Sequence, residues 1–254
     1  MGRLQGEAAI VTGATSGMGR ATALLFAREG AAILASGRDS ERGAALVEEI
    51  RSAGGRAEFV AGDVAELETN QRLVDECLAR FGRLGAVSSN AGMLGLGSVT
   101  ELSPDTWRQA LAVNLDAVFY LMRCAVPALR RSGGGSIVVT SSIAAFKGFP
   151  NHAAYCASKG AVVALVRQAA IDLGPEVRVN ALCPGPVDTP LIWDSAAAFP
   201  DPARAVSAVG EKTLLKRLGQ PDDVARAALF LASSESSWIT GSALTIDGGI
   251  MTGA

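Results

Sequence analysis

The chain has 254 residues, of which 49% are hydrophobic and 19% are charged, and its formal net charge is −2. A chain of this length and composition buries a large core, and we expect a single domain over residues 1–254 because α/β folds of about 200–250 residues are routinely undivided. Basic residues form no run longer than a pair such as Arg130 and Arg131, so the charge pattern argues against a nucleic-acid partner.

Cysteine, histidine and N-terminal patterns narrow the class of protein further. The four cysteines lie far apart without a C-x-x-C pair, and there is one histidine, so we expect neither a disulfide framework nor a metal site. The first residues lack the apolar length and cleavage site of a signal peptide, and no stretch approaches the ~20 apolar residues of a membrane span. The sequence therefore predicts a cytoplasmic protein with a small-molecule partner and no membrane contact.

Short apolar runs alternate with longer stretches of helical pattern along the whole chain. The runs are continuously apolar, which predicts strands buried on both faces, as in a parallel sheet between two layers of helices. The expected class is α/β, with a doubly wound parallel sheet of about seven strands and helices on both faces. The predicted strands are AAIV (8–11), AAILA (31–35), EFVAG (58–62), LGAVSS (84–89), SIVVTS (136–141), VRVNAL (177–182) and ALTID (243–247). One predicted helix opens at 12–19, and three further helices are predicted at 41–53, 105–131 and 222–232.

A glycine-rich turn follows the first predicted strand, and a helical run at 20–29 comes directly after it. Glycine permits a tight turn and lets the backbone approach a pyrophosphate, while a helix N-terminus supplies unpaired N–H donors and a partial positive charge. The turn predicts a dinucleotide site, although a turn that only connects strand to helix would also explain the glycines. Its candidate phosphate-binding residues are Gly13, Thr15, Ser16, Gly17, Met18 and Gly19.

The spacing T-G-x-x-x-G-x-G at 12–19 resembles the cofactor turn of the short-chain dehydrogenase/reductase (SDR) family, in its compact branch of similar length, and further matches cover nearly the whole chain. The resemblance implies a Rossmann fold, a nicotinamide cofactor and a homotetramer. The apolar run at 238–251 is either a subunit contact or simply the last strand and its cover. Ser89 stands where the family's N-N-A-G element has its first asparagine. Elements that resemble the family's other cofactor contacts hold Asp63 and Val64, then Asn90, Ala91 and Gly92, then Pro184, Gly185, Val187 and Thr189.

The end of the second predicted strand bears on cofactor preference. A carboxylate that accepts both ribose hydroxyls is expected for NAD, and Gly37 offers none, whereas the guanidinium of Arg38 suits the oxygens of a 2′-phosphate. Asp39 is a counter-signal, since it could neutralise Arg38 or pair with the ribose, and Ser16 occupies the place of a second basic residue. The sequence favours NADP(H), with NAD(H) as the alternative.

Two polar residues are candidates for chemistry. Asn114 is an amide inside the predicted long helix, where helix propensity favours other residues, and a buried, satisfied polar side chain is the alternative. Ser142 follows the fifth predicted strand, and strand carboxyl ends are where sheet enzymes gather reacting groups. Ser141 is its neighbour and rival, and the family's spacing to the tyrosine selects Ser142.

Tyr155 and Lys159 are four residues apart, which on a helix places a phenol and an ammonium on the same face. A nearby cation stabilises a phenolate, so we expect Lys159 to lower the pKa of Tyr155. The pattern Y-x-x-x-K alone is common by chance and gains weight only from the other motifs. The resemblance implies that Tyr155 exchanges the hydroxyl proton while Ser142 positions the substrate oxygen. It also implies that Lys159 binds the nicotinamide ribose and that Asn114 holds a water linking this lysine to solvent.

The predicted function is an oxidoreductase that moves a hydride between NAD(P)(H) and a secondary alcohol or ketone. A catalytically silent, NAD(P)-sensing regulatory protein of the same fold is the alternative, although such proteins generally lose the tyrosine or the lysine. A methyltransferase on a doubly wound sheet also uses a glycine turn, but it has no use for Tyr155 and Lys159.

Residues 184–215 hold five prolines and no clear strand. Ligands bind beyond the carboxyl ends of sheet strands, and this segment follows one, so we expect a substrate lid at about 186–215 rather than a surface excursion without function. His152 is expected to face a pocket wall or a loop rather than the reacting atoms. Sugars, cyclic alcohols, steroids and 3-oxoacyl thioesters are all candidate substrates. The segment also carries large apolar side chains, which indicate either an apolar or ring-bearing substrate or a loop that packs on itself. They are Leu191, Ile192, Trp193 and Phe199.

Overall fold

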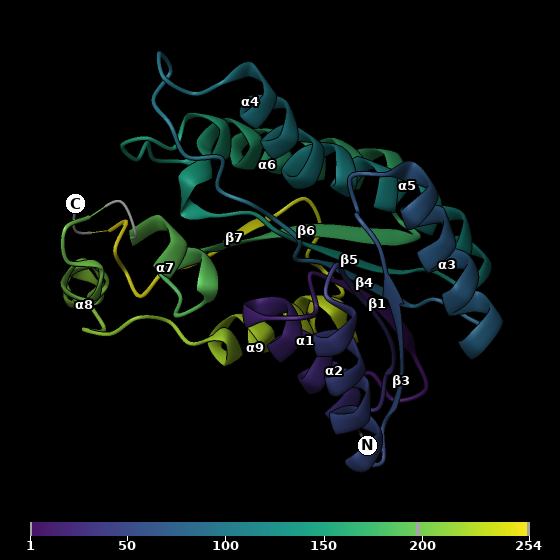
Figure 1. The fold of residues 1–254 in the computed structure, drawn as a ribbon. Helices are drawn as coiled ribbons and strands as arrows, with labels where there is room; N and C mark the ends of the chain where they lie inside the picture. The colour runs from purple at the N-terminus through teal and green to yellow at the C-terminus, as the bar shows by residue number, and fades with distance from the viewer. Residues whose placement is uncertain (1, 197–198, 253–254) are drawn as a thin grey trace.

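A seven-stranded sheet forms the centre of the computed structural model, which describes residues 2–196 and 199–252 (Figure 1). All neighbouring strands pair in parallel, in the order β3-β2-β1-β4-β5-β6-β7. The strand order reverses between β1 and β4, and doubly wound sheets bind their ligands at such a switch point. The strands are β1 (Ala8–Thr12), β2 (Ala32–Gly37), β3 (Arg56–Ala61), β4 (Ala86–Ser89), β5 (Gly135–Thr140), β6 (Val177–Pro184) and β7 (Ala243–Ile246).

Two layers of helices cover the sheet, one on each face (Figure 1). The predicted doubly wound α/β fold is therefore confirmed, and each of the seven predicted strands overlaps an observed one. One layer consists of α1 (Gly17–Arg28), α2 (Ser40–Ser52) and α9 (Pro221–Ala232). The other consists of α3 (Leu67–Phe81), α4 (Pro104–Leu111), α5 (Ala117–Arg131) and α6 (Ala153–Leu173). Shorter helical turns lie at Ala112–Asp116, Ile143–Ala145 and Ser234–Ser236.

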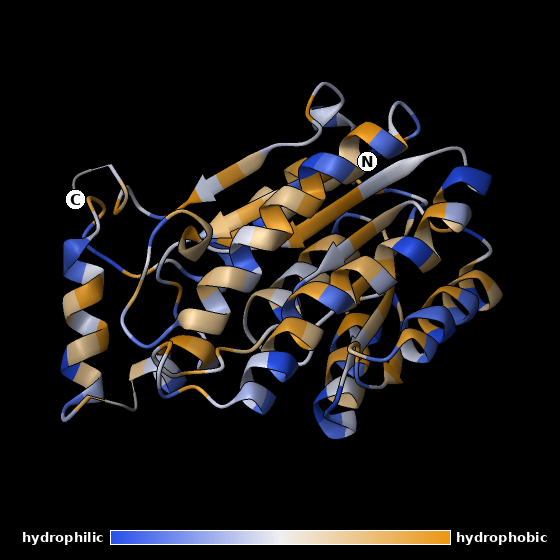
Figure 2. Ribbon diagram, turned by 90° about the horizontal axis from the view of Figure 1, so that it is seen from above, coloured by the Kyte–Doolittle hydropathy of each residue, from blue (hydrophilic) through white to orange (hydrophobic). Residues whose placement is uncertain are grey.

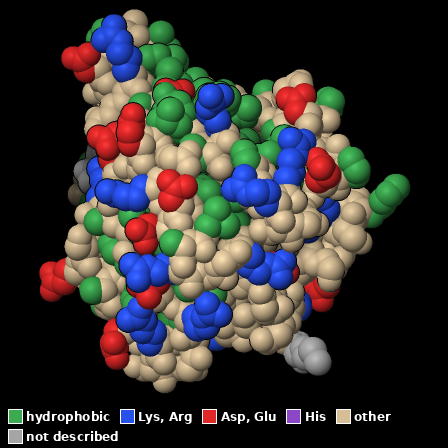
Figure 3. Space-filling model, turned by 90° about the vertical axis from the view of Figure 1, so that its right-hand side faces the viewer, with side chains coloured by type: hydrophobic (Ala, Val, Ile, Leu, Met, Phe, Trp, Pro, Cys, Tyr) green, Lys and Arg blue, Asp and Glu red, His purple; other side chains and the backbone are tan. Residues whose placement is uncertain are grey.

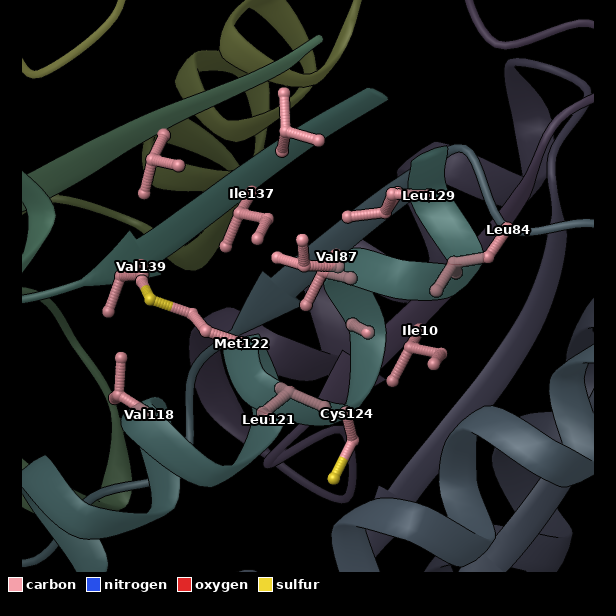
Figure 4. Close-up of a cluster of buried hydrophobic side chains, with 14 of the residues drawn as sticks. Ile10, Leu84, Val87, Val118, Leu121, Met122, Cys124, Leu129, Ile137 and Val139 are labelled. Carbon is pink, nitrogen blue, oxygen red and sulfur yellow. The ribbon is translucent and has the colours of Figure 1, made fainter. Parts of the chain in front are cut away.

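The side chains of the strands alternate between two hydrophobic clusters, one beneath each helix layer. In β1, Ile10 belongs to the cluster beneath α3, α5 and α6, while Val11 belongs to the cluster beneath α1, α2 and α9. Figure 4 shows the first cluster, which gathers Leu129 of α5 with Ile137 of β5. Figure 2 shows the same arrangement as apolar strands between helices that carry hydrophilic residues on one side. Burial on both faces explains why the strands are continuously apolar in sequence.

The predicted helix at 105–131 is one continuous helical segment, but a π-helical turn at Ala112–Asp116 separates α4 from α5. Its start follows the sequence signal, because the Ser103 side chain accepts a hydrogen bond from the Thr106 N–H at 3.1 Å. The expectation that no stretch suffices to span a membrane was wrong for this segment. Among the described residues, Pro104–Arg131 is the one helix long and apolar enough to do so by length and composition, with a mean hydropathy of 1.3 over an 18-residue window. In the fold, its apolar face is buried against the sheet in the core.

Two further helices, α7 (Pro190–Ala196) and α8 (Pro202–Lys212), lie at the end of the molecule that is leftmost in Figure 1. The segment expected as a lid at 186–215 is therefore largely helical, with residues 197–198 outside the described part of the chain. Pro202 does not prevent a helix because it lies in the first turn of α8, where a missing N–H removes no helical hydrogen bond. Asp201 caps the same helix by accepting from the Arg204 N–H at 3.0 Å.

Charged side chains of both signs are intermixed on the face shown in Figure 3. Ion pairs at the surface include Arg51 with Glu58 at 2.6 Å and Arg130 with Glu176 at 2.7 Å. Exposed pairs of this kind contribute about 0–1 kcal/mol each, so the buried clusters dominate the stability of the fold.

Candidate active site

The glycine-rich turn lies between β1 and α1, at the switch point of the sheet. Gly13 and Gly17 have φ angles of 63° and 51°, a left-handed conformation that residues with side chains rarely adopt. A Cβ atom on Gly13 would lie 2.7 Å from the backbone nitrogen of Ala91, so the turn packs directly on the segment after β4. The side chain of Ser16 does not cap α1, which leaves the N–H groups of its first turn available to an anion. The turn therefore fits a pyrophosphate.

A cleft of about 300 Å³ extends from this turn across the carboxyl ends of the central strands. Most of the predicted cofactor residues line it, although they come from six separate segments of the chain. They are Gly13, Thr15, Ser16, Gly17, Met18, Gly19, Gly37, Arg38, Asp63, Val64, Asn90, Ala91, Gly92, Tyr155, Lys159 and Thr189. Residues that also line the cleft, and that the sequence did not single out for it, are Gly62, Val113, Thr140, Ser141, Pro190, Leu191 and Asp194.

Three predicted cofactor residues do not line the cleft. Pro184, Gly185 and Val187 line the neighbouring apolar pocket instead. The chain leaves β6 on the β7 side, where a Cβ atom on Gly185 would lie 2.7 Å from the Cα atom of Asp247. This close packing directs the first part of the segment along the pocket. Thr189, at the far end of the motif, reaches both cavities.

Arg38 and Asp39, the two residues after β2 that bear on cofactor preference, have different surroundings. Asp39 caps α2 by accepting from the Arg42 N–H at 3.0 Å, and its carboxylate pairs with the Arg42 guanidinium at 3.2 Å. Arg38 is exposed and lines the cleft. Asp39 is thus held by Arg42, and of these two residues Arg38 is the one that lines the cleft.

Helix α6 brings Tyr155 and Lys159 to the inner end of the cleft. Lys159 is buried, its Nζ donates a hydrogen bond to the carbonyl oxygen of Thr140 at 2.9 Å, and this nitrogen lies 5.7 Å from the centroid of the Tyr155 ring. Burial lowers the pKa of Lys159 to about 8. At mildly alkaline pH, the buried lysine is therefore present in both its charged and its neutral form.

The pKa of Tyr155 differs from the expectation. Burial raises it, while a hydrogen bond with the side chain of Ser142 lowers it to a smaller extent. Lys159 was expected to lower this pKa, but its ammonium is directed at the carbonyl oxygen of Thr140, and burial of the phenol is the larger effect.

Ser141 and Ser142 have different surroundings at the end of β5. The Ser141 hydroxyl is buried and donates to the backbone carbonyl of Lys159 at 2.9 Å, so it is occupied in holding α6 against the strand. The Ser142 oxygen accepts from the Ala144 N–H at 3.1 Å and contacts Tyr155 at the apolar pocket. Of the two serines, Ser142 is the one whose hydroxyl is close to the phenol.

Asn114 lies in the π-helical turn and lines neither cavity among the described residues. Its amide exchanges two hydrogen bonds with the backbone of Met93, at 2.8 and 2.9 Å, and donates a third to the Ser158 hydroxyl at 2.9 Å. A Cβ atom on Gly92 would lie 3.3 Å from the Asn114 Oδ1 and 3.6 Å from the Lys159 Nζ. Both polar atoms therefore face the same point beside Gly92, which the glycine leaves free of a side chain.

Asn90 links the strand ends beneath the cleft. Its Oδ1 accepts from the Thr140 hydroxyl at 2.8 Å, and its Nδ2 lies 3.1 Å from both the carbonyl and the hydroxyl oxygens of Ser88. Through Thr140, this network also reaches the lysine, because the Thr140 carbonyl accepts from Lys159. The sequence did not single out Ser88 or Thr140, since hydroxyl residues at strand ends carry no motif of their own.

An apolar pocket of about 220 Å³ adjoins the cleft at Tyr155, which lines both cavities. The lid segment supplies one wall through Leu191 and Ile192, as the sequence suggested. Trp193 instead donates from its ring nitrogen to the Asp188 carboxylate at 2.9 Å, and it does not line the pocket. Further pocket residues that the sequence did not single out are Leu94, Ile143, Ala144, Phe149, Ser195, Val209 and Ile250.

Comparison with known proteins settles the family. A family model described as "Enoyl-(Acyl carrier protein) reductase" matches residues 13–251. The chain belongs to the short-chain dehydrogenase/reductase family. Among its SDR relatives, the 3beta-hydroxysteroid dehydrogenase of Mediterraneibacter gnavus is 39% identical, over 99% of this chain and 97% of the relative. The cyclopentanol dehydrogenase of Comamonas testosteroni is 40% identical, over 98% of both chains.

Solved SDR structures have the same fold. The crystal structure of levodione reductase superposes with a TM-score of 0.95 at 28% identity, covering 99% of this chain and 100% of that one. The relatives are named as dehydrogenases and reductases, and this chain is accordingly an SDR oxidoreductase that uses NAD or NADP.

Proposed function

We propose that this SDR enzyme interconverts a secondary alcohol and a ketone on a small ring, with Tyr155 as the general acid/base. The observation that carries the proposal is the position of Tyr155, which lines both the cleft and the apolar pocket. A pocket of about 220 Å³ with mostly apolar walls suits a single carbocycle better than a four-ring steroid or a long acyl thioester. The relative named for cyclopentanol supports the same substrate class.

The cofactor is proposed to lie in the cleft. The glycine turn would hold the pyrophosphate, Asp63 and Val64 the adenine, and Thr189 the nicotinamide end. Bound NAD(P) supplies the hydride acceptor or donor. Asn90 and the buried Lys159 would close the inner end of the cleft against bulk water.

The proton is handled by the residues around the phenol. In the direction of alcohol oxidation, the substrate hydroxyl lies between Ser142 and Tyr155. The Ser142 O–H donates to the substrate oxygen, and the Tyr155 phenolate accepts the substrate proton. Lys159 stabilises the phenolate as a cation and passes protons onward, with Asn114 at the other side of Gly92 as the proposed site of a water.

A panel of alcohols and ketones tests this function. The purified enzyme is assayed with each compound and each nucleotide by the change in nicotinamide absorbance, and nucleotide binding is measured separately. We expect turnover of cyclic secondary alcohols and ketones. Nucleotide binding without turnover of any compound would contradict the proposal and would favour the regulatory alternative.

We further propose that NADP(H) is the preferred cofactor, because Arg38 lines the cleft and Asp39 is paired with Arg42. A charge-assisted hydrogen bond of roughly 1.5–3 kcal/mol corresponds to about a ten- to hundredfold preference. We expect Arg38→Ala to remove that preference in kcat/KM, while Arg51→Ala, on the helix α2 that follows and paired with Glu58, keeps it. A parent enzyme that prefers NAD, or an unchanged preference in Arg38→Ala, would refute the assignment.

A homotetramer is the proposed assembly. Strand β7 is an edge of the sheet, and apolar side chains near it are exposed, with Trp238 at 98%, Ile171 at 76% and Leu244 at 38%. Exposed apolar residues beside an unpaired strand edge favour a subunit contact. Light scattering is expected to give a mass about four times 26.0 kDa. A monodisperse species near 26.0 kDa would rule the assembly out.

A further inference from the structure

The apolar pocket has a second polar end that the proposed proton transfer does not use. His152, which precedes α6, and Ser195, on the lid helix α7, both line it. The Ser195 Oγ lies 3.2 Å from the His152 Nε2, so the two side chains meet across the pocket wall. Leu191, Ile192 and Val209 of the lid also line the pocket and are apolar, while the polar Thr189 lies where the pocket meets the cleft. Away from the cleft, His152 and Ser195 are therefore the polar pair on the lid side.

The protonation pattern of His152 follows from its contacts. Its Nδ1 lies 2.6 Å from the carbonyl oxygen of Pro150, and a carbonyl only accepts, so Nδ1 carries a hydrogen. In the neutral imidazole, Nε2 then has a free lone pair and accepts. The Ser195 hydroxyl donates to it and keeps its own oxygen lone pairs available.

The imidazole is also held at a fixed place relative to the phenol. Its ring packs against Tyr155 edge-on, at 72° and with the ring centroids 6.1 Å apart, and against Phe149 at the same centroid distance. His152, Ser195 and the phenol of Tyr155 therefore lie at fixed places in the wall of one pocket. A ring whose reacting oxygen contacts Tyr155 can present another substituent to His152 and Ser195 within that pocket.

We propose that the pocket selects a ring ketone or alcohol that carries a second hydroxyl on the side away from the reacting carbon, bound between His152 and Ser195. This inference rests on the proposed function. A hydroxyl satisfies both partners, because its O–H donates to the His152 Nε2 while its oxygen accepts from the Ser195 O–H. A second carbonyl could only accept from Ser195 and would leave Nε2 without a donor. His152 and Ser195 are thus specificity-determining residues rather than catalytic ones.

The size of the effect follows from the hydrogen bonds exchanged. With an unsubstituted ring, His152 and Ser195 keep their mutual hydrogen bond, so the second hydroxyl gains about one net bond. One such bond corresponds to roughly a five- to tenfold gain in kcat/KM. The far hydroxyl does not change during the reaction, so this gain is expected in KM rather than in kcat.

The test compares reduction of 4-hydroxycyclohexanone, cyclohexanone and 1,4-cyclohexanedione by the full-length enzyme. We expect a roughly five- to tenfold preference for the hydroxyketone over cyclohexanone, carried by KM, and no comparable gain per carbonyl for the dione. The double variant Ser195→Ala/His152→Phe is expected to abolish the preference, because it leaves the far hydroxyl no partner. His152→Phe alone keeps an aromatic ring against Phe149 and Tyr155, and it is expected to remove the discrimination between the hydroxyketone and the dione, because Ser195 can then donate to either oxygen without leaving Nε2 unpaired. This single variant carries the test if the double variant does not fold.

The matched control is Ser207→Ala on α8, an exposed lid serine that does not line the pocket, and it is expected to keep the parental preference. Equal kcat/KM for the hydroxyketone and cyclohexanone in the parent, or a preference that survives both pocket substitutions, would overturn the inference and leave the proposed function standing. Absence of turnover with all three ketones would overturn both.

Discussion

We expect Tyr155→Phe to lower kcat by about 10²–10⁴-fold, the usual contribution of a general acid/base. The substitution removes only the phenolic oxygen, so the ring still packs against His152 and still forms the boundary between cleft and pocket. Nucleotide affinity is expected to stay close to that of the parent. The measurement is steady-state turnover of a cyclic alcohol from mildly acidic to alkaline pH, together with nucleotide binding by fluorescence or calorimetry.

Tyr120→Phe provides a matched control, because it removes a phenolic oxygen from α5 at a position that lines neither cavity. Parental turnover in this control, with loss in Tyr155→Phe, assigns the loss to the site. If Tyr155→Phe kept near-parental kcat over the whole pH range, another group would have to move the proton and the mechanism proposed here would be wrong.

We expect Lys159→Met to lower kcat for alcohol oxidation by about 10²-fold or more and to move its pH dependence. Burial raises the pKa of Tyr155, so the phenol is protonated at neutral pH and the phenolate that oxidation needs forms as the pH rises. Parental oxidation is therefore expected to accelerate with pH. Without the cation of Lys159, the phenolate is less favoured, and the rise is expected at higher pH in the variant.

Stability measurements separate this catalytic effect from damage to the fold. Burial lowers the pKa of Lys159 from 10.5 to about 8, so burying the lysine opposes folding fully below about pH 8 and progressively less as the pH rises to 10.5, and methionine removes this cost. The variant also leaves the Thr140 carbonyl without its donor, which opposes the gain. A thermal midpoint near that of the parent, with an unmoved pH profile, would show that Lys159 does not act on the phenol.

The strands were predictable because each is buried between two helix layers, which imposes a continuous apolar run. The ends of the strands were harder to predict. Strand β3 begins at Arg56, two residues before the predicted run, because its backbone pairing with β2 extends to this residue. The exposed arginine side chain carries no apolar signal that would have indicated it. The lid helices were missed for a related reason. Closely spaced prolines are typical of irregular chain, whereas Pro190 and Pro202 each occupy the first position of a helix.

The candidate site likewise has residues that the sequence could locate and residues that it could not. The glycine turn and the pair Tyr155 and Lys159 are contiguous motifs whose geometry follows from one local element, so the sequence located them. Ser195 and Ile250 come together in the pocket wall only through the path of the lid and of the chain after β7. The pKa of Tyr155 could not be read from spacing, because it depends on how deeply the phenol is buried and on where the lysine is directed.

Because of the π-helical turn at Ala112–Asp116, the number of residues between Ser103 and Ser132 sets how the two parts of this helix are rotated relative to each other. Such a turn holds one residue more than an α-helix would, and each residue rotates an α-helix by about 100°. Deleting one residue there would restore a regular helix and swing either Asn114 away from Met93 or the apolar face of α5 away from the sheet. Homologues and engineered variants can therefore exchange side chains in this segment more readily than they can shorten it.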